Sequence, residues 1–111
     1  MSSDKSYLKL VLDKLDSLYD INYKSMMGEY IIYYKNKIIA YVCDNHLFIK
    51  PTNKAKYLIK DYVLKPPYQN AKDMIFIENI NDYSNDFFNE LFISMYDELP
   101  LVNNKKRKIK L

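Results

Sequence analysis

The sequence is short of the residues on which most catalytic and metal sites are built. Its 111 residues include one glycine, one cysteine, one histidine and no tryptophan. These numbers leave no internal disulfide, too few soft ligands for a zinc cluster, and no glycine-rich phosphate loop. Most nucleophile and base triads are excluded on the same ground. The composition therefore indicates a protein that is not an enzyme and that uses no metal or cofactor.

Long hydrophobic runs are also missing. The longest unbroken apolar run, 38–43, has six residues, whereas a membrane-spanning helix needs about 18 or more. The first residues lack the basic segment followed by an apolar stretch that marks a secretory signal. We therefore expect no membrane segment and a cytosolic location. With 49% hydrophobic and 28% charged residues, the composition is that of one globular domain.

Charge is distributed unevenly along the chain. Five of the 17 basic residues lie in the last seven positions, and all 14 acidic residues precede Leu99. We interpret 1–103, where acidic residues are in slight excess, as a single domain and 104–111 as a basic disordered tail. Because phosphate neutralisation dominates nucleic-acid affinity, any contact with nucleic acid is expected to start at the tail. Its candidate contact residues are Lys105, Lys106, Arg107 and Lys108.

Two segments show the three- and four-residue apolar spacing of amphipathic helices. The first covers 4–19, with Ser3 or Asp4 as its cap. The second covers 83–99, is the strongest periodic signal in the chain, and is stopped by Pro100. The methionine and aromatic residues of the second segment indicate core packing rather than a cofactor site.

Between these helices the chain becomes rich in β-branched and aromatic residues. Three runs, 30–34, 38–43 and 47–50, predict a three-stranded antiparallel meander. Asn36 and Asn45 lie in the polar segments between the runs, and asparagine tolerates the positive φ that tight hairpin turns need. The sequence therefore predicts two tight hairpins.

Further elements follow the meander. Thr52 or Asn53 can cap a short helix that runs to Ile59. The prolines 66–67 enforce an extended connection, and 74–78 predicts a fourth strand. The expected fold class is α+β: an antiparallel sheet of four or more strands, arranged as a meander. An amphipathic helix lies at each end of the chain, and one short helix lies between the third and fourth strands.

Strand pairing assigns the side chains of the meander to two faces. Two-residue turns place Tyr34 opposite Lys37 and Ile31 opposite Ala40. The first face is aliphatic, is expected to lie beneath the two long helices, and collects Ile31, Tyr33, Ile38, Ala40, Val42, Leu47 and Ile49. The second face collects Tyr30, Ile32, Tyr34, Ile39, Tyr41, Cys43, His46 and Phe48. A three-residue turn at 35–37 would exchange the faces of the first strand.

The second face is too apolar for water, yet it carries hydroxyl groups and an imidazole. It is expected either to be covered by the short helix and the 66–67 connection, or to contact a second subunit or ligand. Cys43 and His46 can meet there, but two ligands do not make a metal site. The candidate binding residues of this face are Tyr30, Tyr34, Tyr41, His46 and Phe48.

Gly28 is the only glycine and stands just before the first predicted strand. A glycine there packs nothing and costs entropy, so it indicates a bulge, a positive φ or a close approach by another backbone. We interpret Gly28 and Asn36 as structural residues.

Several short motifs form an unusual combination. They are Ser25–Tyr30 running into Tyr33–Tyr34, Asp44–Asn45 followed by Leu47, Ile49–Thr52, Pro67–Tyr68 with Ala71–Lys72, and Glu98–Pro100. Together the motifs resemble the N-terminal domain of the TfoX/Sxy competence regulators, particularly its short stand-alone members. This resemblance implies an α+β domain which, in the long members, is linked to transcriptional activation of DNA-uptake genes, and it implies no catalytic residues. The family commonly has glycine at Asn36, and the sequence has no counterpart of the helical C-terminal domain of the full-length activators.

These observations favour a small, non-catalytic binding or regulatory domain. It is expected to act through a protein partner or as a homodimer, using the tyrosine-rich face or an edge strand. The alternative is a nucleic-acid-associated protein whose face aromatics stack on bases while the basic tail binds phosphates. An enzyme would need a site built from Glu29, Tyr41, Asp44 and His46, and a lone histidine on a crowded strand indicates a structural role.

Overall fold

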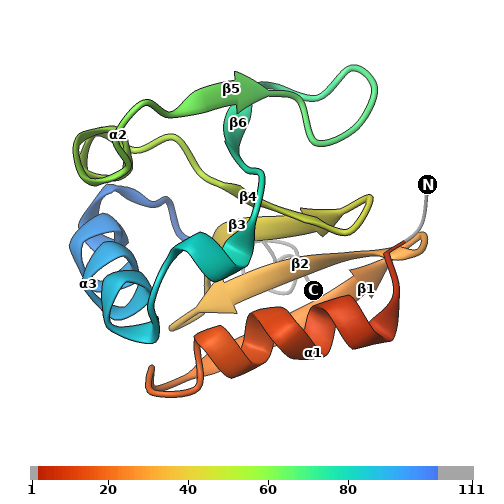
Figure 1. Cartoon of the computed structure of the whole chain (residues 1–111), viewed down its shortest axis with the longest axis horizontal. Coiled ribbons are helices and arrows are strands. Elements are labelled where there is room, and N and C mark those ends of the chain that lie inside the picture. The colour runs from red at the N-terminus through yellow and green to blue at the C-terminus, as the bar shows by residue number, and fades with distance from the viewer. Residues whose placement is uncertain (1–2, 103–111) are drawn as a thin grey trace, which may run out of the picture.

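A six-stranded antiparallel sheet forms the centre of the fold in the computed structural model, which describes residues 3–102 (Figure 1). The strand order in the sheet is β1-β2-β3-β4-β6-β5. In chain order the elements are α1 (Lys5–Lys14), β1 (Ile21–Met26), β2 (Glu29–Tyr34), β3 (Lys37–Cys43), β4 (His46–Ile49), α2 (Asn53–Leu58), β5 (Val63–Lys65), β6 (Met74–Ile77), η1 (Ile80–Asp82), α3 (Asn85–Met95) and η2 (Tyr96–Glu98). The predicted α+β class is confirmed.

The predicted meander corresponds to β2, β3 and β4. Its two turns have two residues each, and φ is positive at all four: Lys35 (49°), Asn36 (67°), Asp44 (51°) and Asn45 (54°). Positive φ at both central residues is the type I′ pattern, whose twist matches that of the flanking strands. The predicted hairpins, and the left-handed backbone at both asparagines, are confirmed.

Strand β1 was not predicted. It pairs with β2 along its whole length, from Ile21 opposite Tyr34 to Met26 opposite Glu29. Its four central residues are exposed, so the sequence shows no alternation of buried and exposed side chains. The strand therefore depends on backbone pairing with β2 rather than on side-chain burial. The three-residue strand β5, which pairs with β6, was missed for the same reason.

Gly28 occupies the turn between β1 and β2. Met27 and Gly28 have φ angles of 52° and 88°, so this hairpin also has two central residues with positive φ. The Gly28 carbonyl also accepts a hydrogen bond of 2.9 Å from the Ser3 backbone N–H. The structure thus shows at Gly28 both a positive φ and the close approach of another backbone segment.

A β-bulge divides the ladder between β2 and β3. Next to the turn, Tyr34 lies opposite Lys37 as predicted, but Ile31 lies opposite Tyr41 instead of Ala40. The register shifts by one residue between these pairs, and a one-residue slip turns every later side chain to the other face. The predicted pairing is therefore correct beside the turn and wrong beyond the bulge.

The bulge decides which β2 side chains face the helices. Tyr30, Ile32 and Tyr34, which were predicted on the second face, are buried in the main core. The rings of Tyr34 and Phe92 of α3 lie 6.3 Å apart between centroids. The predicted placement of these three residues, and of Ile39, on the second face is therefore wrong, because the bulge pairs Ile32 with Ala40 and Tyr30 with Val42. The residues that were predicted beneath the helices but lie outside the main core are Ile31, Tyr33 and Ile38.

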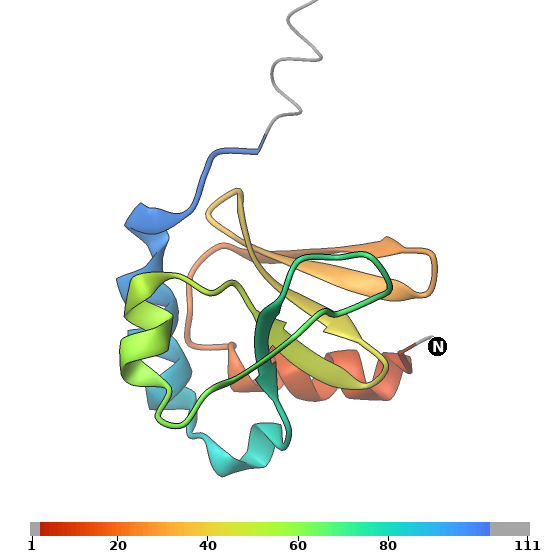
Figure 2. The ribbon, with the colours of Figure 1, turned by 90° about the horizontal axis from the view of Figure 1, so that it is seen from above.

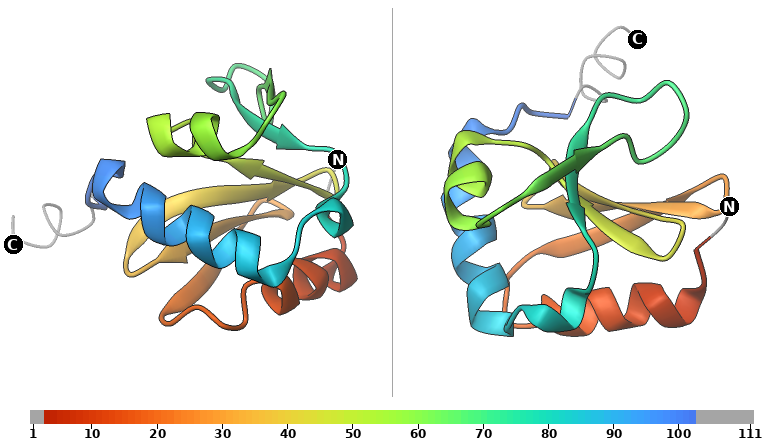
Figure 3. Two further views of the ribbon diagram at one scale, coloured as in Figure 1. Left: turned by 60° about the vertical axis from the view of Figure 1, so that its left-hand side comes forward. Right: turned by 45° about the horizontal axis from the view of Figure 1, so that its top comes forward.

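The main core lies between the first sheet face and the three α-helices. Helix α1 runs along β1 and β2, whereas α2 and α3 lie side by side at one end of the sheet strands (Figures 2 and 3). The helices contribute Leu8, Val11, Leu15, Ala55, Phe88, Leu91, Phe92 and Met95 to this core. None of the helices within residues 3–102 is long and apolar enough to span a membrane.

Side-chain caps begin α2 and α3 but not α1. The predicted cap of α1 by Ser3 or Asp4 is wrong: Asp4 occupies the N-cap position without a side-chain capping bond, and Ser3 Oγ donates to Glu29 instead. Thr52 accepts a bond from the Ala55 N–H at 3.1 Å and begins α2, as predicted. Ser84, which was not predicted as a cap, accepts from the Phe87 N–H at 3.0 Å and begins α3. Helix α1 ends at Lys14, earlier than predicted, because the chain turns there toward β1. Short side-chain acceptors of this kind satisfy the amides that a helix start leaves unpaired.

Candidate functional site

The connection between β5 and β6 covers part of the second sheet face (Figure 3). Pro67 is buried, and the ring of Tyr68 lies 6.2 Å from that of Tyr41, between centroids. Helix α2, in contrast, contributes to the main core on the first face. The sequence predicted that the short helix and the proline-containing connection could cover the second face. The connection does cover part of this face, whereas the short helix α2 packs on the first face.

Beneath this connection lies a small second core. It contains Cys43, Phe48 and Met74, each at most 5% exposed. Burial, together with the negative charge of Glu29, raises the pKa of Cys43 to about 12. Phe48, a predicted binding residue, therefore lies inside the protein, and Cys43 is held as a neutral thiol.

His46 lies at the border of this second core and is half-buried. Its ring is 4.8 Å from that of Phe76, and its Nδ1 is 2.8 Å from the Asp44 carbonyl oxygen. Within residues 3–102, no group of three or more histidine, cysteine and acidic residues could hold a metal ion. The contacts of His46 are those of a packed, hydrogen-bonded side chain. The predicted tail residues Lys105, Lys106, Arg107 and Lys108 lie outside the described part of the chain.

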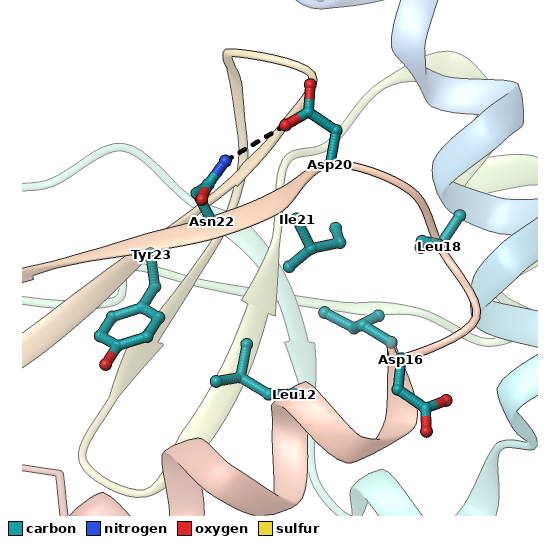
Figure 4. Close-up of a pocket in the computed structure, with 8 residues that line it drawn as sticks. Leu12, Asp16, Leu18, Asp20, Ile21, Asn22 and Tyr23 are labelled. Atoms are coloured by element: carbon teal, nitrogen blue, oxygen red, sulfur yellow. Dashed lines mark hydrogen bonds between the residues drawn. The ribbon is translucent and has the colours of Figure 1, made fainter.

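A groove runs between α1 and β1 on the first face (Figure 4). It consists of two adjoining clefts of about 490 and 560 Å³, both of which are lined by Leu12 and Tyr23. We call it the α1–β1 groove. Leu8, Leu12 and Leu15 of the α1 segment, with Ile21 of β1, make its lining largely apolar. The size and lining suit apolar side chains of a partner.

Strand β1 forms one edge of the sheet, so one side of its backbone has no partner strand within the described residues. The Lys35 N–H donates to the Asp20 carbonyl at 3.0 Å, one pair beyond the start of the β1–β2 ladder. Hydrogen-bonded pairs alternate along an antiparallel ladder, so even-numbered residues 22–26 direct their backbone groups toward β2. The odd-numbered residues Ile21, Tyr23 and Ser25 therefore present their N–H and C=O groups outward.

The two ends of the α1–β1 groove carry opposite charges. Lys5 and Lys9 line the end beside Gly28, whereas Asp16 and Asp20 line the other end. Lys9 Nζ is 3.6 Å from the exposed Asp13 carboxylate, and such surface pairs contribute little to stability. The groove therefore has a basic end, an apolar middle and an acidic end.

Large apolar side chains are exposed around the β1 edge. Tyr19 precedes the strand and is 85% exposed, Tyr23 is 52% exposed, and Met27 in the turn is 98% exposed. Tyr23 also contacts Tyr30 edge-to-face, with ring centroids 5.9 Å apart, and such contacts hold an aromatic side chain in one orientation. Sequence reasoning missed this site because β1 itself was missed. The sequence does contain a signal for this strand. Turn-forming residues in Asp20–Asn22 and Met27–Gly28 flank a segment that has the length of a β-strand.

Comparison with known proteins finds a relative that matches along almost the whole chain. A protein of Spirochaeta aurantia, described as an uncharacterized 12.7 kDa protein in the trpE 5' region, is 27% identical over 110 residues. The match covers 99% of this chain and 95% of the relative. No protein-family model and no solved structure matches the sequence. The relative is similar in sequence and length, and its description assigns no activity.

Proposed function

We propose that this chain is a small, non-catalytic binding domain that pairs with a second copy of itself through the edge of β1. The observation that supports the proposal is the juxtaposition of an unpaired strand edge with the apolar α1–β1 groove. An extended strand can add to such an edge, with backbone hydrogen bonds giving affinity and alternate side chains entering the groove.

A two-fold axis beside Tyr23 makes the β1 edge self-complementary. Two antiparallel copies of β1 then pair Tyr23 with Tyr23 and Ile21 with Ser25, the residues whose backbone groups point outward. On the other face, Lys24 lies opposite Asn22, so the pairing brings no like charges together. The same surface meets itself, as in most dimers with two-fold symmetry.

The charge distribution favours a second copy of this chain, rather than an unrelated strand, as the partner of the β1 edge and the α1–β1 groove. Both clefts share Leu12 and Tyr23, so an axis through these residues exchanges the two ends of the groove. The basic end of one copy, with Lys5 and Lys9, then faces the acidic end of the other, with Asp16. Opposite charges placed across an interface fix its register and orientation.

The regulatory role is part of this proposal and rests on the resemblance to the TfoX N-terminal domain. Dimerisation is a common way for a domain without catalytic groups to present a surface to a further partner. The nucleic-acid alternative stays a prediction that rests on the tail, because Tyr30, Tyr34 and Phe48 are at most 8% exposed and base stacking needs accessible rings.

Two proline variants of neighbouring residues test the proposal. The Ser25 N–H points outward and its side chain is exposed, so Ser25→Pro removes a donor to the second copy and spares the β1–β2 ladder. Lys24→Pro is the matched control, because the Lys24 N–H faces β2 and its loss weakens the fold itself. Light scattering and sedimentation of the full chain, with thermal melting of each variant, measure both effects.

We expect a dimeric wild type, a monomeric Ser25→Pro variant that melts at the temperature of the wild type diluted until it is monomeric, and a still lower melting temperature for Lys24→Pro. A wild-type chain that remains monomeric at about 1 mM would overturn the proposal. A Ser25→Pro variant that dimerises as tightly as the wild type would overturn it as well.

A charge exchange tests the orientation of the two copies. Lys9→Glu or Asp16→Lys alone is expected to weaken dimerisation by up to about thirtyfold, because the two-fold axis forms the pair twice and an exposed ion pair contributes up to about 1 kcal/mol. The double variant restores the attraction with its signs reversed, so its affinity should return toward that of the wild type. Added salt should reduce all these differences. Two single effects that simply add in the double variant would contradict the two-fold arrangement.

A further inference from the structure

Three lysines are half-buried within residues 3–102, and two of them have an acceptor. Lys14 Nζ donates to the Tyr83 carbonyl at 2.7 Å, and Lys37 Nζ donates to the Tyr96 carbonyl at 3.0 Å. Lys50 is different: among the described residues its ammonium group has no hydrogen-bond acceptor and no carboxylate within ion-pair distance. Asn89 Oδ1 is the side-chain atom that is buried without a partner among the described residues, so the Lys50 ammonium group stays accessible to water and to an incoming ligand.

Lys50 borders a pocket of about 280 Å³ on the second face of the sheet. Its Nζ lies 5.8 Å from the centre of the Tyr41 ring, and Tyr68 stands next to Tyr41. Lys72 and Asp73 also line the pocket. The apolar walls are Pro51, Pro67, Ala71 and Met74. The chain thus brings two lysines and two tyrosines, from segments far apart in the sequence, to one concave site.

The charges in this pocket are not balanced by the protein. Burial, followed by the positive charge of Lys72, lowers the pKa of Lys50. Asp73 is the one carboxylate among the lining residues, and it forms no ion pair with either lysine in the described structure. An anion between the two ammonium groups would offset their repulsion and accept a charge-assisted hydrogen bond from Lys50 in place of water.

We propose that this pocket binds a small anionic molecule, with a carboxylate or phosphate group held by Lys50 and Lys72. The flat or apolar part of the molecule lies against Tyr41 and Tyr68. The volume of about 280 Å³ lies just below the range of ordinary ligand sites, roughly 300 to 1,000 Å³, so the molecule carries little more than one ring and its anionic group. The site lies on the opposite sheet face from the α1–β1 groove and does not depend on dimerisation.

Titration of the full chain with phenyl phosphate and with benzoate tests the proposal. Benzyl alcohol, which has the ring but no charge, is the matched control ligand. NMR chemical shifts of Tyr41, Tyr68 and Ala71 are expected to move and saturate with at least one of the two anions and not with the alcohol. The stronger of the two responses identifies the anion as phosphate or carboxylate. No saturable shift with either anion, or equal shifts with the alcohol, would overturn the proposal.

Matched lysine variants separate this pocket from general surface charge. Lys50→Met and Lys72→Met are each expected to weaken binding of the better anion by about tenfold or more, because each removes a charged hydrogen-bond donor. Lys54→Met removes an exposed lysine of α2 that does not line the pocket and should leave the affinity unchanged. Equal losses in all three variants would show attraction to overall charge only and would contradict the site.

Two further variants serve as checks on fold and independence. Lys50→Arg keeps the charge and should retain most of the affinity, whereas Lys50→Met should melt at the same or a higher temperature because it removes an unpaired charge. Ser25→Pro should bind the anion as tightly as the wild type. A loss of binding in Lys50→Met that is matched by a loss of folded structure would count against a direct role for Lys50.

Discussion

The two edges of the sheet are built differently. β5 has three residues, ends directly before Pro66, and places Lys65 over the Phe76 ring at 4.2 Å. β1 has six residues, pairs with β2 without a register shift, and contains no proline. Short strands, lysine and proline are the usual means of keeping an edge from pairing with another chain. The edge at β5 is thus protected, and the edge at β1 remains suited to pairing.

The β1 edge is also held firmly in place by the start of the chain. Ser3 Oγ donates to Glu29 Oε1 at 2.8 Å, and the same carboxylate oxygen accepts from the Asp44 N–H at 3.2 Å. The Asn45 N–H in turn donates to Ser3 Oγ at 3.0 Å. This network ties the β1–β2 turn to the β3–β4 turn. An edge ordered before binding loses less conformational entropy when a second strand adds to it.

The largest expected effect comes from breaking the turn that carries β1. Gly28→Val places a β-branched residue at a φ of 88°, so we expect a loss of about 1 to 3 kcal/mol in the free energy of unfolding. Urea denaturation measures this loss. Met27→Asn is the matched control, because it puts a residue that tolerates positive φ at an exposed turn position and should keep or raise stability. A Gly28→Val variant as stable as the wild type would contradict this explanation of the glycine.

The next effect concerns the polar network that supports the same edge. Glu29→Ala leaves Ser3 Oγ and the Asp44 N–H without their acceptor, so we expect it to destabilise the fold by about 1 to 2 kcal/mol. Glu78→Ala, at an exposed position after β6, is the control and should change stability by less than about 0.5 kcal/mol. A double-mutant cycle with Ser3→Ala should show coupling between Ser3 and Glu29. Purely additive losses would mean that the two side chains act separately.

Cys43 lies in the second core, beneath the connection between β5 and β6. This region contrasts with the β1 edge, because its side chains are buried whereas the outward backbone groups of β1 are accessible. The pKa of Cys43 is raised from 9.0 to about 12 in the folded chain. The neutral thiol therefore contributes stability that is present below pH 9 and is lost as the pH rises from about 9 toward 12. We expect the wild type to lose its stability advantage over Cys43→Ala across this interval, as measured by urea denaturation.

The reactivity of Cys43 gives an independent check. At pH 8 iodoacetamide should alkylate it slowly in the folded protein and rapidly in urea, because thiolate is the reacting form and the side chain is 1% exposed. Rapid alkylation of the folded chain at pH 8 would show that the connection between β5 and β6 does not protect this face.

The smallest effect is expected at the protected edge. Pro66→Ser and Lys65→Thr together should change the free energy of unfolding by less than about 0.5 kcal/mol, because both side chains are exposed. Placed in the monomeric Ser25→Pro background, the pair is expected to produce weak, concentration-dependent association through β5. Sedimentation measures it. A strictly monomeric triple variant would show that the shortness of β5, rather than its lysine and proline, prevents pairing.

Much of the fold could be predicted because its signals are local. The 3.6-residue spacing identified α1 and α3, and the asparagines at 36 and 45 identified two hairpins that the structure confirms. Thr52 gave the start of α2. In each case the residues that carry the signal are themselves the residues that form the apolar stripe, adopt the positive φ of the turn or make the capping hydrogen bond.

The candidate sites could not be predicted in the same way. β1 buries few side chains and exists because β2 pairs with it, so its own sequence carries little signal. Lys50 and Lys72 are brought together only by the path of the connection between β5 and β6. Tyr41 was correctly placed on the second face, but Lys50 and Lys72, which line the same pocket, were not identified as binding residues.

By itself, the sequence determined the class of the fold, the two long helices, the meander and its turns, because propensity, capping and turn chemistry act between neighbouring residues. The tertiary structure alone decided which way β2 faces and where the sheet ends. A single bulge, placed where Ile39 and Ala40 can both enter the core, turned Tyr30 and Tyr34 inward. These side chains pack in one core with residues of α1 and α3, and contacts between such distant segments are not contained in any local pattern.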